Sequence, residues 1–152
     1  MILADARQLA RNEMDKNGLK DWHFTFDKSV SRFGVCRYTD KTIGLSLHLT
    51  SLNNTDRVKD TILHEIAHAL VGHGQGHNNV WRTQAIQLGN SGTRCYSNTD
   101  TITPPKRFKG ICPNCKIETL KNARTKTACG KCCKLNNNGK FTSDYLFKWE
   151  RN

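Results

Sequence analysis

Hydrophobic residues recur at helical spacing in three stretches of the chain. Residues 2–16 carry apolar side chains along one side and stop at Gly18. A second amphipathic helix is predicted over about 55–72, ending at Gly72, and a third over 78–88. The pattern therefore predicts three helices that each pack one apolar side against a core.

Between the first two helices, apolar and polar residues alternate with the period of a strand. The alternation runs through 22–27 and continues in 33–38 and 42–49, with breaks near 29–31 and 40–41. We expect three short antiparallel strands. The two histidines in these strands, His23 and His48, have no partner at ligand spacing and are interpreted as ordinary exposed or packed residues.

Residues 89–105 are rich in Gly, Ser, Thr and Asn and end in two prolines, which is typical of a linker with little packing of its own. Beyond it, strand-like pieces over 107–111, 116–120 and 141–149 surround two pairs of cysteines. The predicted domains are 1–103 and 104–152.

The cysteine pairs have the spacing of a zinc site. Cys112 and Cys115 form one Cys-x2-Cys knuckle, and Cys129 and Cys132 form the other. A module of this size without a large core needs a bound metal ion to stabilise its fold. Disulfide bonds among the same cysteines are the alternative interpretation. Of the remaining cysteines, Cys36 is interpreted as a small buried hydrophobic residue, and Cys95 and Cys133 stay unassigned.

Composition adds an electrostatic prediction. With 152 residues, 36% of them hydrophobic, the chain can bury one modest core and a small satellite module. Its formal charge of +11 favours a polyanionic partner, and residues 106–140 hold ten Lys or Arg against Glu118 alone. DNA is the expected polyanion, and the alternative is a charged surface that only keeps the module soluble. Candidate phosphate contacts are Arg107, Lys109, Lys116, Lys121, Arg124, Lys126 and Lys131. Phe108, Phe141, Tyr145 and Trp149 could stack on bases, although packing inside the module is the commoner role.

The second helix carries the candidate chemistry. His64 and His68, four residues apart, project from one face and can share a zinc ion, with Glu65 beside the open position. An HExxH string can arise by chance, but both histidines point roughly 150° away from the apolar stripe of the helix. They are therefore poor candidates for core residues.

A catalytic zinc ion needs a third protein ligand. The next glutamate after Glu65 is Glu118, far downstream, and the longer HExxHxxGxxH pattern is absent, so His73 and His77 remain. His73 lies too close to the helix end, whereas His77 follows a glycine-rich loop and precedes a helix. We prefer His77 and interpret His73 as a neighbour of the site or an exposed residue.

These motifs together resemble the SprT-like metalloprotease family, which includes the Spartan-type proteases. The resemblance rests on HEIAHALVGHGQGHNNVW, the strand at 43–46 and the four cysteines, and it extends from about Trp22 to Cys132. In that family a third histidine comes from a His-Gly-x-x-aromatic motif, which here reads His77-Asn-Asn-Val-Trp81. Asn78 replaces the usual glycine and tolerates unusual backbone angles as well.

The resemblance implies an α+β fold: a minimal zincin-like domain with an N-terminal helix, a three-stranded antiparallel sheet, the HExxH helix and a following helix, joined to a four-cysteine zinc ribbon. It further implies one catalytic and one structural zinc ion, and an endopeptidase that cleaves proteins bound or crosslinked to DNA. The expected partners are these proteins and DNA, single-stranded or at a junction. The chain is similar to compact bacterial or phage-type forms, so we expect a monomer in the bacterial nucleoid or host cytoplasm; no apolar run could span a bilayer and no secretory signal is present.

The predicted mechanism uses zinc to activate a water molecule and Glu65 as the general base. The strand over 43–49 could offer an edge to an extended substrate. The rival hypothesis is a non-enzymatic DNA-binding or adaptor protein with a structural HExxH site, which has no use for Glu65. A nuclease or small-molecule hydrolase is weaker, because phosphoryl chemistry usually recruits several carboxylates.

Overall fold

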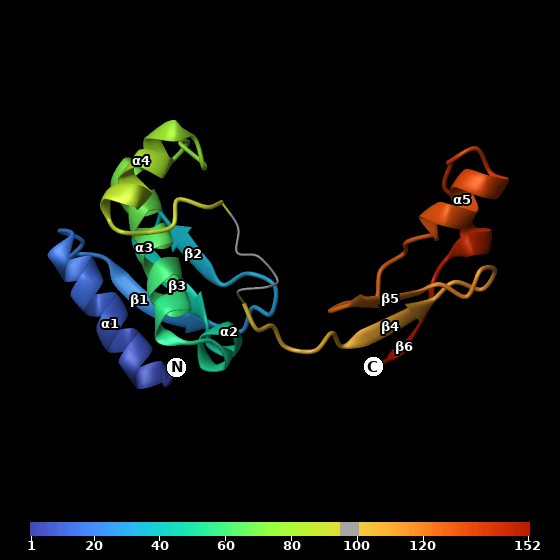
Figure 1. The fold of residues 1–152 in the computed structure, drawn as a ribbon, viewed down its shortest axis with the longest axis horizontal. Coiled ribbons are helices and arrows are strands. Elements are labelled where there is room, and N and C mark those ends of the chain that lie inside the picture. The colour runs from blue at the N-terminus through green and yellow to red at the C-terminus, as the bar shows by residue number, and fades with distance from the viewer. Residues whose placement is uncertain (95–100) are drawn as a thin grey trace. The chain divides into compact units, whose positions relative to one another are not determined.

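The chain folds into two compact units, Met1–Pro104 and Pro105–Asn152. The structure is a computed structural model that describes residues 1–94 and 101–152 (Figure 1). The sequence predicts the boundary between residues 103 and 104, one residue before the boundary that separates the two units in the structure. None of the helices in the described residues combines the length and apolar character needed to cross a membrane.

Three helices of the N-terminal unit match the hydrophobic pattern. Helix α1 spans Leu3–Lys16, α3 spans Thr55–Val71 and α4 spans Asn79–Gln87. Asn54 begins α3, because its side chain accepts a hydrogen bond from the Arg57 backbone N–H. A left-handed Gly72, with φ +83°, ends it.

The sheet of this unit contains β1 (His23–Asp27), β2 (Gly34–Arg37) and β3 (Thr42–Ser46) in the order β1-β3-β2. Strand β2 pairs antiparallel with β3, but β1 pairs parallel with it, so the prediction of an all-antiparallel sheet was wrong for β1. The reason is the unequal connections. The short turn between β2 and β3 allows these two strands to pair only as an antiparallel hairpin. Residues 28–33 are a longer connection that leads from β1 to the opposite edge of the sheet, so β3 pairs between β1 and β2 and runs parallel to β1. All five residues of β3 are buried, as suits a central strand.

The third predicted strand was also too long, because α2 (Leu47–Leu52) follows β3 directly. The Ser46 hydroxyl accepts a hydrogen bond from the Leu49 backbone N–H at 3.0 Å and so begins this helix. His48 therefore lies on a helix. Since β3 is central, it offers no free edge, and the expectation that the strand over 43–49 binds a substrate was wrong.

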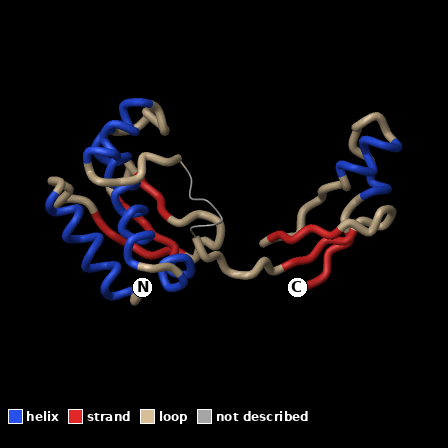
Figure 2. The backbone as a smooth tube through the Cα atoms, in the orientation of Figure 1, coloured by secondary structure: helices blue, strands red, loops and turns tan. Residues whose placement is uncertain are grey.

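The core of the N-terminal unit lies between the sheet and the helices α1 and α3 (Figures 1 and 2). Each of these helices contributes its apolar stripe, so that the core is built mainly from aliphatic side chains, with Phe33 among them. Its buried members include Ala10, Met14, Ile43, Leu45, Leu49, Val58, Ile62 and Ile66.

The segment predicted as a linker is packed at both of its described ends, so that prediction was wrong there. Asn90 is buried and bonded to Asp60 of α3, and Thr101 is buried as well. The Asn53 side chain accepts from the Ile102 N–H and donates to the Ile102 carbonyl, both at 2.8 Å. The Gly, Ser, Thr and Asn residues of this segment are typical of turns, and the sequence alone does not show that they have hydrogen-bond partners far away in the chain. Cys95 lies outside the described residues.

The C-terminal unit has a three-stranded antiparallel sheet. Strand β4 (Phe108–Ile111) lies between β5 (Glu118–Lys121) and β6 (Lys148–Arg151). The strand predicted over 141–149 forms only from residue 148; before it stands a 3-10 turn, Ser143–Tyr145. Helix α5 (Gly130–Asn136) was not predicted, because its short sequence lacks an apolar stripe.

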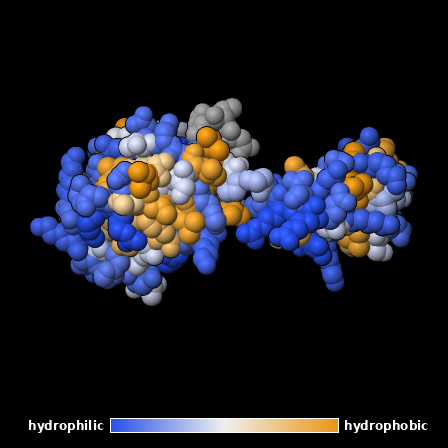
Figure 3. All heavy atoms as spheres, turned by 90° about the horizontal axis from the view of Figure 1, so that it is seen from below, coloured by the Kyte–Doolittle hydropathy of each residue, from blue (hydrophilic) through white to orange (hydrophobic). Residues whose placement is uncertain are grey.

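This unit buries cysteines in place of aliphatic side chains. Within residues 105–152, all of which the structure describes, the buried hydrophobic residues are Cys112, Cys129, Cys132 and Cys133. Large hydrophobic residues stay exposed among the hydrophilic ones that dominate its surface in Figure 3; they are Ile117, Leu120, Leu135 and Phe141. The hydrophobic effect alone therefore gives this unit little stability.

Candidate active site

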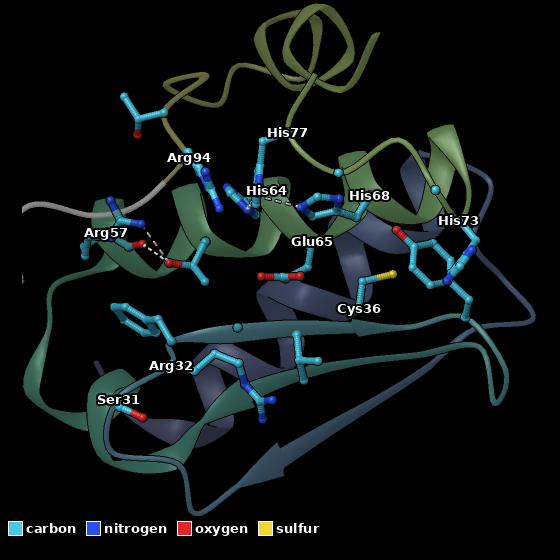
Figure 4. A pocket seen from close by; sticks show the side chains of 18 residues that line it. Ser31, Arg32, Cys36, Arg57, His64, Glu65, His68, His73, His77 and Arg94 are labelled. Atoms are coloured by element: carbon cyan, nitrogen blue, oxygen red, sulfur yellow. Dashed lines mark hydrogen bonds between the residues drawn. The ribbon is translucent and has the colours of Figure 1, made fainter. Parts of the chain in front are cut away.

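Three histidine rings converge at the surface of α3. The Nε2 atom of His77 lies 3.0 Å from Nε2 of His64 and 3.1 Å from Nε2 of His68 (Figure 4). His64 and His68 lie one turn apart on α3, as their spacing predicts. Together the three rings form a group whose ligand atoms all lie within 4.8 Å of one another.

The loop after α3 explains why His77 reaches this group. Gly72, Gly74 and Gly76 all have positive φ and reverse the chain direction. The Asn78 side chain then accepts from the backbone N–H groups of Val80 and Trp81, which begins α4 immediately after the ligand. Asn78 at the usual glycine position thus acts as a helix cap.

His73 is not part of the group. It is exposed on the same loop, and its ring lies edge-on to Tyr38 with the centroids 5.4 Å apart. It borders the cavity beside the three rings.

Trp81 of α4 packs against all three imidazoles. Its ring is almost fully buried, and its centroid lies 4.6 Å from those of His64 and His77 and 5.2 Å from that of His68. One rigid aromatic side chain therefore limits the movement of all three rings.

The protonation of the three histidines favours metal binding. Burial and the neighbouring rings lower the pKa of His64 to about 3, and burial with the nearby His77 lowers that of His68 to about 4. Burial, together with the charge of Arg94, also lowers the pKa of His77. The rings are thus neutral at physiological pH, which is the form that binds a cation.

Glu65 is a buried carboxyl group next to these rings. It is 7% exposed, and burial raises its pKa to about 8 against the opposing charge of Arg32. Gly34 of β2 makes room for it, because a Cβ atom at that position would lie 2.5 Å from Oε1 of Glu65. The side chain therefore occupies a close-fitting space between α3 and β2.

A cavity of about 840 Å³ opens in front of the histidines and Glu65. Residues 31–36 of the β2 region border it, together with the loop that carries His77. Burial, with a contribution from Glu65, raises the pKa of Cys36 to about 12, so this thiol in the wall is unreactive. Burial likewise raises the pKa of Tyr38 to about 12 and keeps its hydroxyl protonated.

The four knuckle cysteines of the C-terminal unit form a second group. The Sγ atoms of Cys112 and Cys132 lie 3.7 Å apart and those of Cys115 and Cys129 lie 3.6 Å apart. These distances are too long for disulfides, in which the sulfur atoms are about 2.05 Å apart. Cys133 is buried nearby but is not part of the group.

Both groups fit a tetrahedral zinc ion. Ligands at about 2.0–2.1 Å (nitrogen) or about 2.3 Å (sulfur) from such an ion lie roughly 3.3 and 3.8 Å from each other, close to the separations found here. The histidine group offers three ligands and leaves a fourth position open, as catalytic zinc sites do. The cysteine group offers four and is closed.

Fold and site together define a mixed α+β domain with a histidine metal group and an adjacent buried carboxyl. The sequence model of the SprT-like family matches residues 3–101, and the chain belongs to that family. This membership indicates a domain of the zinc metalloprotease type. A search of curated proteins found no match.

Several residues of the site were missed in the sequence. Gly34 interrupts a strand pattern, and an isolated glycine in a strand often marks a close backbone approach. The sequence marks Trp81 only as the aromatic position of the motif that begins at His77, although its spacing from His77 places it on the first turn of a helix beside the ligand. Arg32, Tyr38 and Arg94 border the cavity without any pattern that predicts it.

Proposed function

We propose that this protein is a zinc-dependent endopeptidase that cleaves proteins bound or crosslinked to DNA. The observation that supports the peptidase part best is the buried Glu65 carboxyl beside three neutral imidazoles, at the wall of an open cavity. A purely structural metal site needs neither the open position nor a carboxyl that burial disfavours.

His64, His68 and His77 would hold the ion, and when bound it would supply a Lewis acid that polarises the scissile carbonyl and makes a water molecule more acidic. Glu65 acts as the general base: it takes a proton from the attacking water and delivers it to the leaving amine nitrogen. Its buried position keeps the carboxylate poorly solvated and therefore basic. A cation held by the three rings would lower the pKa of Glu65 and so favour its ionised form near neutral pH.

The substrate binds along β2 in this proposal. Strand β2 is an edge strand, since it pairs with β3 on one side only, and residues 33–36 border the cavity next to Glu65. An extended segment that adds to this edge is held mainly by its own backbone, which makes cleavage depend on chain flexibility more than on side-chain identity. A sharp side-chain consensus in mapped cleavage sites would contradict this part.

The C-terminal unit binds the DNA. Residues 105–152 hold twelve Lys or Arg against three Asp or Glu, out of 24 and 13 in the whole chain. The two faces of its sheet differ. On one face, Lys109 is paired with Glu118 at 2.6 Å and lies 4.0 Å from Glu150, so its charge is largely neutralised.

The opposite face combines aromatic rings with cations. The register places Phe108, Lys121, Trp149 and Arg151 there, and Arg124 reaches over the Phe108 ring. The Trp149 ring lies over Gly110 and donates its indole N–H to the Thr125 carbonyl at 2.9 Å, which fixes its orientation. We call this set of residues the aromatic-basic face. Rings and unneutralised cations on one surface suit the bases and phosphates of single-stranded DNA.

The experiment uses the zinc-loaded full-length chain and a DNA-binding protein crosslinked to an oligonucleotide. Cleavage is compared with single-stranded DNA, with double-stranded DNA and with the free protein. Wild type should cut the crosslinked protein, and Glu65→Gln should lose about 10²–10⁴-fold in rate while keeping two zinc equivalents. Intact substrate with metal-replete wild type would refute the peptidase, and equal cleavage without DNA would refute the DNA-directed part.

A further inference from the structure

The segment that follows α4 is attached to the helix that carries the metal ligands. The Asn90 side chain donates to the Asp60 carbonyl and to Oδ1 of Asp60, both at 2.8 Å. Ser91 adds its backbone N–H to the same Oδ1 at 2.8 Å and its hydroxyl to Oδ2 at 3.2 Å. One carboxylate thus fixes two successive residues, and Asn90 is itself only 6% exposed.

The turn is fixed from within as well. Oδ1 of Asn90 accepts the Gly92 N–H at 2.8 Å, and Gly92 has φ +68°, which favours glycine. A Cβ atom at Gly92 would lie 3.0 Å from Ile86 of α4. The chain direction at residues 90–92 is therefore strongly determined.

The position of Asp60 gives this attachment a consequence for the site. Asp60 and His64 are four residues apart on α3 and share a face of the helix. The attached segment consequently passes His64, and Thr93 and Arg94 border the cavity. Thr93 and His64 border the same cavity, and the Thr93 backbone opposes the lowering of the His64 pKa. Since Nε2 of His64 faces His77, Nδ1 is the nitrogen available to a backbone acceptor such as the Thr93 carbonyl.

We propose that Asp60, Asn90 and Ser91 form a positioning network for the metal site: they hold the Thr93 carbonyl against the His64 imidazole, which keeps the proton on Nδ1 and leaves Nε2 free to bind the ion. Outer partners of this kind fix the orientation and tautomer of a ligating histidine. The proposal rests on the metal-binding part of the proposed function and is independent of whether the ion serves peptide cleavage.

A matched pair of variants tests the network in the full-length protein. Asn90→Ala removes it, and Asn53→Ala removes an equally buried asparagine that bonds residue 102 in the same way but lies just before the N-terminal end of α3, about three helical turns from His64. Asn90→Ala should weaken zinc binding at the histidine site by about 10–100-fold, measured by chelator competition, with the cysteine site as an internal reference. Asn53→Ala should leave that affinity within about threefold, although both variants should unfold at lower denaturant concentration.

A second readout follows the tautomer itself. In the metal-free wild type, ¹⁵N NMR should show His64 protonated on Nδ1, and in Asn90→Ala it should show a mixture of the two tautomers. Asp60→Asn, which keeps an acceptor for Asn90 and Ser91, should restore the Nδ1 form that Asp60→Ala loses. Wild-type zinc affinity in Asn90→Ala, an equal loss in Asn53→Ala or an unchanged tautomer in Asn90→Ala would overturn the proposal. A wild-type protein that binds zinc but cleaves nothing would refute the protease and leave the network intact.

Discussion

The two units of the chain differ in what they bury. The N-terminal unit buries mainly aliphatic side chains between a sheet and two helices, and its histidine group does not belong to that core. The C-terminal unit buries four cysteines, three of which belong to its own metal group. A metal ion at the first site would bind to a unit that already has a hydrophobic core, whereas an ion at the second would supply most of the interactions that hold its unit together. The same element would thus serve chemistry in one unit and stability in the other.

The largest effect should come from a cysteine in the C-terminal unit. Cys112→Ser removes one of four ligands from a unit with no other core, so residues 105–152 should lose their fold while the N-terminal unit keeps it. Cys133→Ser is the control, since that cysteine is buried nearby but outside the group. Amide NMR spectra and zinc counting decide this. A dispersed C-terminal spectrum in Cys112→Ser would remove the distinction between the units.

The next effect concerns the histidine site. His77→Ala should lose the second zinc equivalent and at least about 100-fold in peptidase activity, but should keep the N-terminal unit folded, because no core residue is changed. His73→Ala, a change on the same loop, should retain both zinc equivalents and activity within about threefold. Metal analysis, circular dichroism and a cleavage assay are sufficient. Unfolding of His77→Ala would show that this metal also completes a fold.

A third prediction concerns the pKa of Glu65 in protein from which a chelator has removed the metal. In this form only the N-terminal unit is expected to stay folded. Its folded pKa of about 8 lies above the ordinary value, so between about pH 4.5 and 8 the folded state holds a proton that the unfolded state releases. The free energy of unfolding contributed by Glu65 therefore falls as pH rises through this window, by roughly 3–5 kcal/mol in total.

The test compares wild type with Glu65→Gln by denaturant unfolding across that pH range. The variant should be as stable as wild type near pH 4.5 and more stable at pH 8.5. The lowered pKa values of His64 and His68 reduce the free energy of unfolding only below the ordinary histidine pKa. Both proteins contain these histidines, so their contribution cancels when wild type and variant are subtracted. Zinc should abolish most of the difference by favouring the carboxylate. A constant difference at all pH values would mean that Glu65 is not desolvated.

The smallest effect tests the two faces of the C-terminal sheet. Lys121→Ala, on the aromatic-basic face, should weaken single-stranded DNA binding a few-fold and reduce the slope of log K against log salt by about 0.7. Lys109→Ala, on the opposite face, should change both much less, because two glutamates already neutralise that charge. Fluorescence anisotropy at several salt concentrations measures both quantities. Equal effects of the two changes would mean that the faces are equivalent.

The helices α1, α3 and α4 and the histidine and cysteine groups could be predicted from the sequence because their determinants are local. The stripe of α3, its cap at Asn54 and the four-residue spacing of its histidines all lie within one segment. The two cysteine knuckles are equally local. The family resemblance agrees with the family match over residues 3–101.

What could not be predicted depends on partners far apart in the chain. The alternation in residues 23–27 indicates a strand but not that it runs parallel to β3. Leu47 and Leu49 alternate with polar residues as in a strand, yet the Ser46 cap makes them helical. Asn90 and Ser91 resemble linker residues in the sequence because their partner, Asp60, lies some thirty residues earlier in the chain.

Trp81 gives the histidine site a built-in optical reporter. Its indole ring touches all three imidazoles, whereas Trp22 packs near Tyr38 and Trp149 belongs to the other unit. A paramagnetic cobalt ion held by those rings would quench Trp81 emission strongly, because the ion would lie next to the indole ring. Loading and release of the ion can therefore be followed in real time in the unlabelled protein.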